Sequence, residues 1–128
     1  MELWAMTEIP RILIVDDEPE IREELAEYLA GKGYRVIVAG DGPEALAKFQ
    51  AEPCDLVITD MKMPGKSGAD LIKEVRESVS PDMKFIVMTG HGGATVGMNG
   101  VDIKAYPFLR KPLDISELIE SVKTVLGS

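Results

Sequence analysis

The sequence predicts an α/β fold in which helices cover both faces of a doubly wound, five-stranded parallel sheet. Short runs of strand-forming residues alternate with stretches of helical spacing, and this alternation is typical of parallel strands, because each parallel pair needs a crossover connection. Three of the runs are almost wholly apolar instead of alternating in polarity, as expected for strands buried on both faces. We expect two helices on one face of the sheet and three on the other.

The five predicted strands are short and rich in β-branched residues. Pro107, in the last of them, has no N–H to donate, which places that strand at an edge of the sheet. The runs are Arg11–Val15, Arg35–Ala39, Leu56–Thr59, Lys84–Thr89 and Ala105–Arg110.

The predicted helices follow recognisable start signals. Pro19 suits the first turn of a helix whose apolar residues recur every four positions as far as Leu29. Three later helices are each preceded by a capping-box pair, in which an Asp or Ser stands three residues before an acidic residue. These pairs are Asp41 with Glu44, Ser67 with Asp70, and Asp114 with Glu117.

The fourth predicted helix, at Gly92–Gly100, is weak. It contains four glycines, and a glycine inside a helix costs about 1 kcal/mol relative to alanine. We therefore expect the fourth helix to be marginally stable.

Composition sets the class of protein. The chain has 128 residues, which suits one domain, and we assign residues 1–10 to an N-terminal tail and 11–126 to the domain. Neither a membrane span nor a signal peptide is evident, and the one cysteine, Cys54, has no internal partner, which together predict a cytoplasmic protein without membrane contact. A net charge of -8 argues against direct binding of nucleic acid.

Polar residues follow the ends of several strands. Asp16 and Asp17 follow the first strand, Asp60 the third and Lys111 the fifth, while Thr89 ends the fourth. Taken singly, each has an ordinary explanation as a helix cap, a turn residue, the end of a strand or a solvated charge. Ligands of open parallel sheets bind beyond the carboxyl ends of the strands, so the five residues together predict a site there.

The residue types in this predicted site favour phosphoryl chemistry. Crowded carboxylates repel one another unless one takes a proton or a cation neutralises them, and oxygen ligands of this kind suit Mg²⁺. A carboxylate beside Mg²⁺ can attack phosphorus to form an aspartyl-phosphate. Lys111 and the hydroxyl of Thr89 would then hold the phosphoryl oxygens.

Four segments in order, "ILIVDDEP", "DLVITDMKMPGKSG", "FIVMTGHG" and "FLRKPL", resemble the receiver domain of two-component response regulators, the family of the chemotaxis regulators. The resemblance implies a flavodoxin-like sheet with strand order 2-1-3-4-5. It also implies that Asp60 accepts a phosphoryl group from a sensor histidine kinase or a phosphotransfer protein. Mg²⁺ would be held by Asp16, Asp17, Asp60 and the backbone carbonyl of Lys62.

The resemblance further implies a switch. Thr89 would move toward the phosphoryl group, Phe108 would turn inward, and Lys111–Pro112 would be a cis peptide. The output partner, whose identity the sequence does not give, would bind the face formed by the fourth helix, the fifth strand and the last helix. Lys62 and His91 would flank the path of the hydrolytic water. Such a module assists its own phosphorylation and dephosphorylation but is not an enzyme acting on other molecules.

Two other functions are possible on this fold. An aspartyl-nucleophile phosphatase typically needs a second acid two residues after the nucleophile, where this chain has Lys62. A flavin- or nucleotide-binding protein would need a glycine-rich phosphate loop after the first strand, where this chain has the acidic "DDEPE". Both alternatives are disfavoured by these residues.

Overall fold

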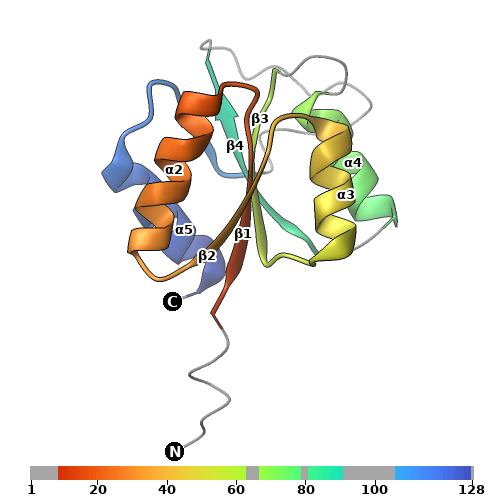
Figure 1. Cartoon of the computed structure of the whole chain (residues 1–128), viewed down its shortest axis with the longest axis horizontal. Helices are drawn as coiled ribbons and strands as arrows, with labels where there is room; N and C mark the ends of the chain where they lie inside the picture. Colours follow the sequence, from red (N-terminus) through yellow and green to blue (C-terminus); the bar gives the residue numbers. More distant parts are fainter. Residues whose placement is uncertain (1–8, 63–66, 79–80, 91–105, 128) are drawn as a thin grey trace, which may run out of the picture.

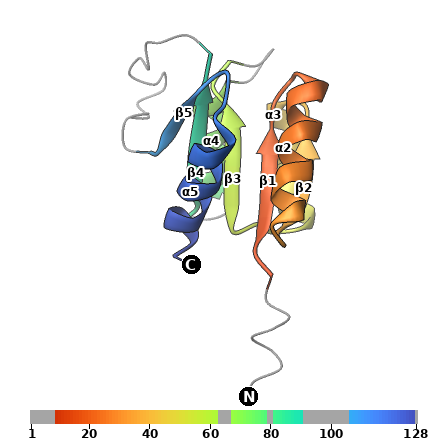
Figure 2. The same ribbon diagram turned by 90° about the vertical axis from the view of Figure 1, so that its left-hand side faces the viewer.

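The computed structural model describes residues 9–62, 67–78, 81–90 and 106–127, and these residues form one parallel sheet between two layers of helices (Figure 1). The strand order is β2-β1-β3-β4-β5, with every neighbouring pair parallel, which confirms the predicted topology. Figure 2 shows β2 and β5 at the two edges. The strands are β1 (Arg11–Val15), β2 (Arg35–Ala39), β3 (Leu56–Asp60), β4 (Lys84–Thr89) and β5 (Phe108–Arg110).

Two strands differ from their predicted bounds. β3 extends by one residue to include Asp60, because the register pairs Asp60 with Met88 of β4. β5 begins only at Phe108 and is shorter than predicted, because Pro107 has no N–H for the ladder; its carbonyl instead accepts a hydrogen bond from the amide of Val87. As predicted, this proline-containing strand lies at an edge of the sheet.

The helices are divided evenly between the two faces in the described part of the chain. α2 and α5 lie side by side on one face, and α3 and α4 lie on the other (Figures 1 and 2). The predicted fourth helix, at 92–100, lies outside the described residues. None of the described helices has the length and apolarity needed to cross a membrane. The helix bounds are α2 (Pro19–Gly31), α3 (Gly42–Ala51), α4 (Gly68–Ser78) and α5 (Ile115–Leu126).

The predicted start signals act where expected. Asp41 accepts a hydrogen bond from the amide of Glu44, and Asp114 accepts from the amides of Ser116 and Glu117. Before α4, the hydroxyl of Ser67 accepts from the amide of Asp70 and the carboxylate of Asp70 accepts from the amide of Ser67, which is a complete capping box.

Neither Asp16 nor Asp17 is the N-cap of α2, although a helix-cap role is the ordinary explanation for these residues in the sequence. The N-cap residue is Glu18, whose side chain makes no capping hydrogen bond, and Pro19 begins the helix. Asp16 bonds instead to the amide of Glu18, so its carboxylate is bound by the turn between β1 and α2. The two aspartates are therefore free of a helix-capping role.

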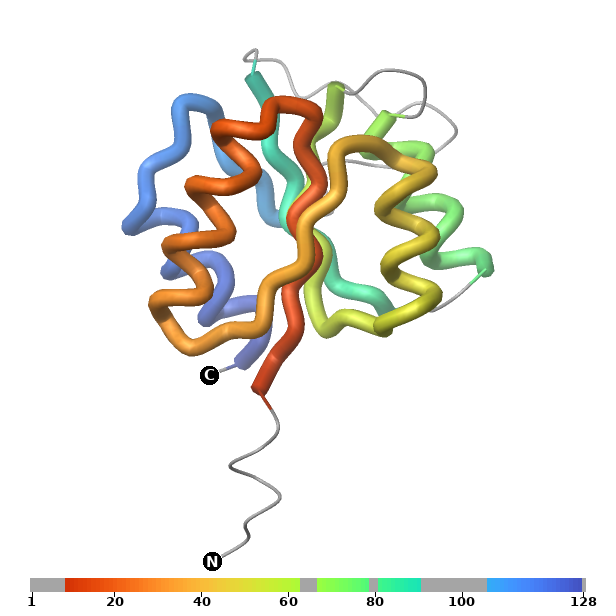
Figure 3. The backbone as a smooth tube through the Cα atoms, in the orientation of Figure 1, coloured from red at the N-terminus to blue at the C-terminus, as the bar shows by residue number. Residues whose placement is uncertain are grey.

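Each face of the sheet has its own hydrophobic core, since alternate residues of a strand point to opposite faces. Leu13, Val57 and Phe85 pack with the residues of α3 and α4, whereas Ile14 and Ile58 pack with those of α2 and α5. Figure 3, which traces the backbone, shows the strands running between the two layers of helices. Burial on both faces explains the continuous apolar runs in the sequence and leaves the carboxyl edge as the place where polar side chains gather.

Candidate functional site

Three charged side chains meet at the carboxyl edge of the sheet. Nζ of Lys111 lies 2.8 Å from Oδ2 of Asp16 and 3.0 Å from Oδ2 of Asp60. Both aspartates are buried, with 0% and 5% of their surface exposed. The strand order explains the meeting, because β1 and β4 flank β3 and Lys111 follows β5 next to β4.

Asp16 is held firmly in this cluster. Its amide donates a 3.1 Å hydrogen bond to the carbonyl of Ala39, and its Oδ1 accepts a 2.9 Å hydrogen bond from the amide of Glu18. Its Oδ2 is buried and receives no well-aligned hydrogen bond from the described residues, although the ammonium of Lys111 is near. A buried carboxylate oxygen that lacks a well-aligned hydrogen bond is suited to bind a cation.

Burial sets the electrostatics of Asp60. Burial raises its pKa above the ordinary value, the charge of Asp16 adds to this effect, and the hydrogen bond and charge of Lys111 oppose it. Burial alone would lower the pKa of Lys111, but its contacts with Asp16 and Asp60 outweigh burial and raise it. Lys111 is therefore held in its charged form between two carboxylates.

Acidic oxygens for a cation lie beside this cluster. Among the described residues, Asp16, Asp17 and Glu18 can each present a carboxylate oxygen within 4.8 Å of the others, and Asp60 is not part of this group. Glu18 was not predicted as a site residue, although it also lies 3.5 Å from Nζ of Lys111. Its place directly after the two predicted aspartates was the available signal. The donor set, all carboxylate oxygen, fits Mg²⁺.

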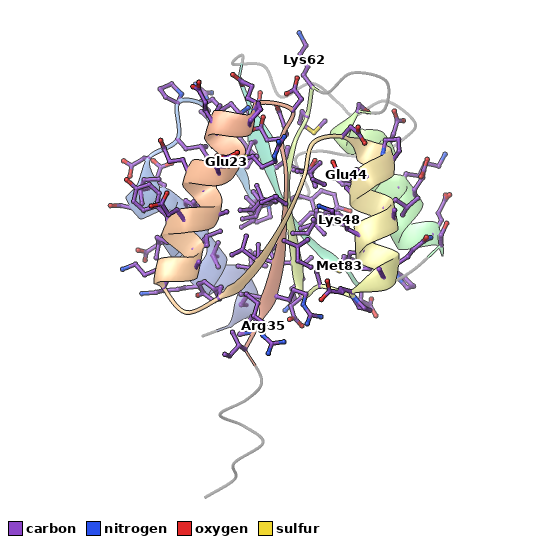
Figure 4. The ribbon with its side chains drawn as sticks, viewed as in Figure 1. Glu23, Arg35, Glu44, Lys48, Lys62 and Met83 are labelled. Carbon is purple, nitrogen blue, oxygen red and sulfur yellow. The ribbon has the colours of Figure 1, made fainter. Side chains whose placement is uncertain are left out.

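The remaining predicted residues surround the cluster. The amide of Lys62 donates a 3.3 Å hydrogen bond to Oδ1 of Asp60, and its exposed side chain extends from the carboxyl edge (Figure 4). Thr89 is buried at the end of β4, and its carbonyl accepts a hydrogen bond from the amide of Lys111. Phe108 is 42% exposed. The Lys111–Pro112 peptide is cis, as predicted, and His91 lies outside the described residues.

This arrangement agrees with the comparison to known families. A model of the response regulator receiver domain matches residues 12–123. The chain belongs to this family. Receiver domains are phosphorylation-dependent signalling modules of two-component systems and not enzymes in the usual sense. They interact with histidine kinases or phosphotransfer proteins and bind Mg²⁺ at an acidic site.

Curated relatives share the whole domain. Response regulator RR06 of Streptococcus pneumoniae is 37% identical over 115 residues, which cover 90% of this chain and 52% of that protein. Transcriptional regulatory protein AruR of Pseudomonas aeruginosa is 35% identical over 126 residues, which cover 94% of this chain and 51% of that protein. The chain thus spans about half the length of the curated relatives it matches.

Solved structures resemble the receiver domain closely. Response regulator TrrA of Thermotoga maritima, solved in complex with Mg²⁺ and BeF, has 39% sequence identity and a TM-score of 0.79, covering 91% of this chain and 99% of that one. Chemotaxis protein CheY4 of Vibrio cholerae has 31% identity and a TM-score of 0.81, covering 91% of this chain and 98% of that one.

Gly68 packs against the backbone of the receiver site and is not among the residues that the sequence predicts for it. A Cβ at this position would lie 2.5 Å from the backbone oxygen of Asp60 and 3.0 Å from Cα of Met61. The first residue of α4 thus packs directly on the backbone that carries Asp60. The signal was the glycine two residues after Lys66 in "GKSG", where the chain enters the helix.

We expect Gly68→Ala to destabilise the domain by about 1–3 kcal/mol, the range for overpacking a close contact. The backbone at Asp60 must shift to admit the methyl group, so the substitution should also disturb the site. Urea unfolding measures the first effect, and the amide NMR shifts of Asp60 and Met61 measure the second. Gly31→Ala is the control, because a Cβ there meets nothing within 4 Å; equal effects of the two substitutions would contradict the prediction.

Proposed function

We propose that this receiver domain, residues 11–126, accepts a phosphoryl group on Asp60 from a sensor histidine kinase or a phosphotransfer protein in the cytoplasm. The observation that supports this most directly is the buried carboxylate of Asp60, which lies 3.0 Å from Lys111 beside a second buried carboxylate, Asp16. Asp16, Asp17 and Asp60, together with the backbone carbonyl of Lys62, would hold Mg²⁺.

The chemistry follows from the charges around Asp60. An oxygen of its carboxylate attacks phosphorus, an O–P bond forms, and the P–N bond to the donor imidazole breaks. Lys111 favours the ionised, nucleophilic form of Asp60 and then pairs with the new phosphoryl oxygens. Mg²⁺, when bound, supplies positive charge that offsets the negative charge collected there. The acidic residues around Asp60 would repel a dianionic donor without a cation.

The output of phosphorylation is a change at the β5 edge. Thr89, buried at the end of β4, moves toward the phosphoryl group, and the exposed Phe108 on β5 turns inward. An output partner binds the face that includes β5 and α5; the predicted fourth helix, which was expected to belong to this face, lies outside the described residues. Lys62 and His91 slow the attack of water on the phosphorylated Asp60, so the module also controls its own dephosphorylation.

Acetyl phosphate, a small phosphodonor, tests the proposal without a partner protein. The purified chain should gain one phosphoryl group, measured by intact mass, when acetyl phosphate and Mg²⁺ are both present, and none when EDTA removes the metal. The product should be labile in base, as a mixed anhydride is. Repeated turnover of the donor without a stable adduct would instead support the phosphatase alternative.

The metal ligands are tested in the same assay. Replacing both Asp16 and Asp17 by Asn should remove the Mg²⁺ dependence of the amide NMR spectrum and reduce labelling strongly, because few carboxylates give Mg²⁺ only a modest hold. The matched control replaces Asp55 by Asn, an aspartate at the opposite end of β3. An unchanged Mg²⁺ titration of the double variant would place the metal elsewhere.

A further inference from the structure

Arg22 is a half-buried cation of α2 that the chemistry above does not use. Its Nη1 donates a 2.8 Å hydrogen bond to the backbone carbonyl of Asp16. A charged donor makes a stronger hydrogen bond than a neutral one, and this bond is partly shielded from water. The side chain therefore holds the turn that joins β1 to α2, where the acidic residues lie.

With this bond, the backbone of Asp16 and one oxygen of its carboxylate are all held by hydrogen bonds. Its amide is held by the carbonyl of Ala39, its Oδ1 by the amide of Glu18, and its carbonyl by Arg22. The polar atom left over is Oδ2, which faces Lys111. With the backbone of Asp16 held at two points and its Oδ1 at a third, the carboxylate has little freedom to turn, and Oδ2 keeps a fixed direction.

Gly40, at the end of β2, makes room for the guanidinium. A Cβ at Gly40 would lie 3.0 Å from Nη1 of Arg22 and 3.5 Å from Oε1 of Glu44. The backbone of Gly40 is itself tied to α3, because its amide donates a 2.7 Å hydrogen bond to Glu44. A methyl group at position 40 would therefore crowd Nη1 of Arg22, and the guanidinium would have to shift by a few tenths of an ångström.

Lys48 reinforces this tie between β2 and α3. It pairs with Glu44 at 3.2 Å and donates a 2.6 Å hydrogen bond to the carbonyl of Val38. Figure 4 shows Glu44 and Lys48 next to each other on α3, facing the end of the strand. The backbone of Gly40 is thus held by α3. A side chain added at position 40 would therefore be accommodated by movement of the Arg22 side chain and not of the Gly40 backbone.

We infer that Arg22 is a positioning residue for the cation site. By holding the carbonyl of Asp16 it fixes the turn that carries this carboxylate, which would be one of the ligands of Mg²⁺, and Gly40 leaves the space that the guanidinium needs. The inference rests on the proposed function, since it concerns the same metal. Groups that orient metal ligands typically change metal affinity 10–100-fold when they are removed, and we expect about tenfold here.

The opposing explanation is that Arg22 only adds positive charge to an acidic helix. The two explanations predict opposite signs. Removing a cation near the site should tighten Mg²⁺ binding if charge alone matters, because less repulsion remains. Removing a positioning residue should weaken binding. Gly40→Ala alters no charge and so isolates the geometric effect.

The experiment is an Mg²⁺ titration of the full unphosphorylated chain, followed by the amide NMR shifts of Asp16 and Asp17. Arg22→Ala should raise the half-saturating Mg²⁺ concentration about tenfold. Arg22→Lys should restore part of the loss, because an ammonium can also donate to the carbonyl. Gly40→Ala should weaken binding less than Arg22→Ala, and adding it to Arg22→Ala should have no further effect, because the two act through one contact.

Arg35→Ala is the matched control. It removes the same charge from an exposed arginine at the opposite end of the molecule (Figure 4) and should leave the titration unchanged. If the wild type binds Mg²⁺ and Arg22→Ala binds it equally or more tightly, the inference is wrong while the proposed function stands. If the wild type shows neither Mg²⁺ binding nor phosphorylation, the proposed function fails and the inference falls with it. Should Arg22→Ala unfold, Gly40→Ala decides the matter, and unchanged affinity there overturns the inference.

Discussion

Asp60→Asn is expected to abolish phosphorylation by acetyl phosphate. An amide has no anionic oxygen with which to form a stable bond to phosphorus. The other buried carboxylate in contact with Lys111, that of Asp16, is fully buried, and its Oδ1 already accepts a hydrogen bond from the amide of Glu18. Intact mass should show complete loss of the added phosphoryl group. Asp82→Asn, which alters an exposed aspartate before β4, should be labelled as the wild type is. Persistent labelling of the Asp60 variant would move the phosphorylation site to another residue.

The same substitution should stabilise the metal-free fold at neutral pH. Burial raises the pKa of Asp60, so the folded protein holds this proton more tightly than the unfolded chain does. Stability therefore falls as the pH rises from the ordinary value of 3.8 through the raised pKa, and asparagine avoids this loss. Urea unfolding in EDTA should show an advantage for Asp60→Asn at neutral pH that shrinks as the pH falls toward 3.8. A variant less stable than the wild type at neutral pH would contradict this.

Lys111→Met is expected to be the most destabilising single change at the site. It leaves the carboxylates of Asp16 and Asp60 buried without their common cation, and removing one partner from a buried ion pair typically costs about 3–5 kcal/mol. The raised pKa of Lys111 also indicates that the charged lysine stabilises the fold, because folding favours its charged form. This contribution to stability is lost only as the pH rises through the raised pKa.

Mg²⁺ should largely compensate for the missing ammonium. A cation bound by the same carboxylates replaces the lost charge, so added Mg²⁺ should stabilise Lys111→Met more than it stabilises the wild type. Urea unfolding with EDTA and with excess Mg²⁺ measures both parts of this prediction. Lys73→Met, at an exposed position of α4, is the control and should change stability little. Equal responses of the wild type and Lys111→Met to Mg²⁺ would show that the metal does not share the pocket of the ammonium.

The strands were the most predictable part of the fold. The buried strands are apolar on both faces, so their sequences stand out without knowledge of their neighbours, and the bounds of β1, β2 and β4 match the prediction. The short β5 was less predictable, because Pro107 interrupts the ladder at a place that depends on the partner strand. The helix starts at Asp41, Ser67 and Asp114 were predictable because capping is local chemistry within four residues.

The class of fold and the convergence of Asp16, Asp60 and Lys111 at one edge were predictable from the amino-acid sequence, because they follow from local patterns and from the rule that parallel strands end together. The receiver family was predictable from the resemblance of four segments. Which atoms meet is known from the folded structure alone: the contact of Lys111 with both aspartates, the close packing of Gly68 against the backbone of Asp60, and the hydrogen bond from Arg22 to the carbonyl of Asp16. Such contacts depend on ångström-scale distances between segments far apart in the chain or on the orientation of a long side chain, and no local sequence pattern records either.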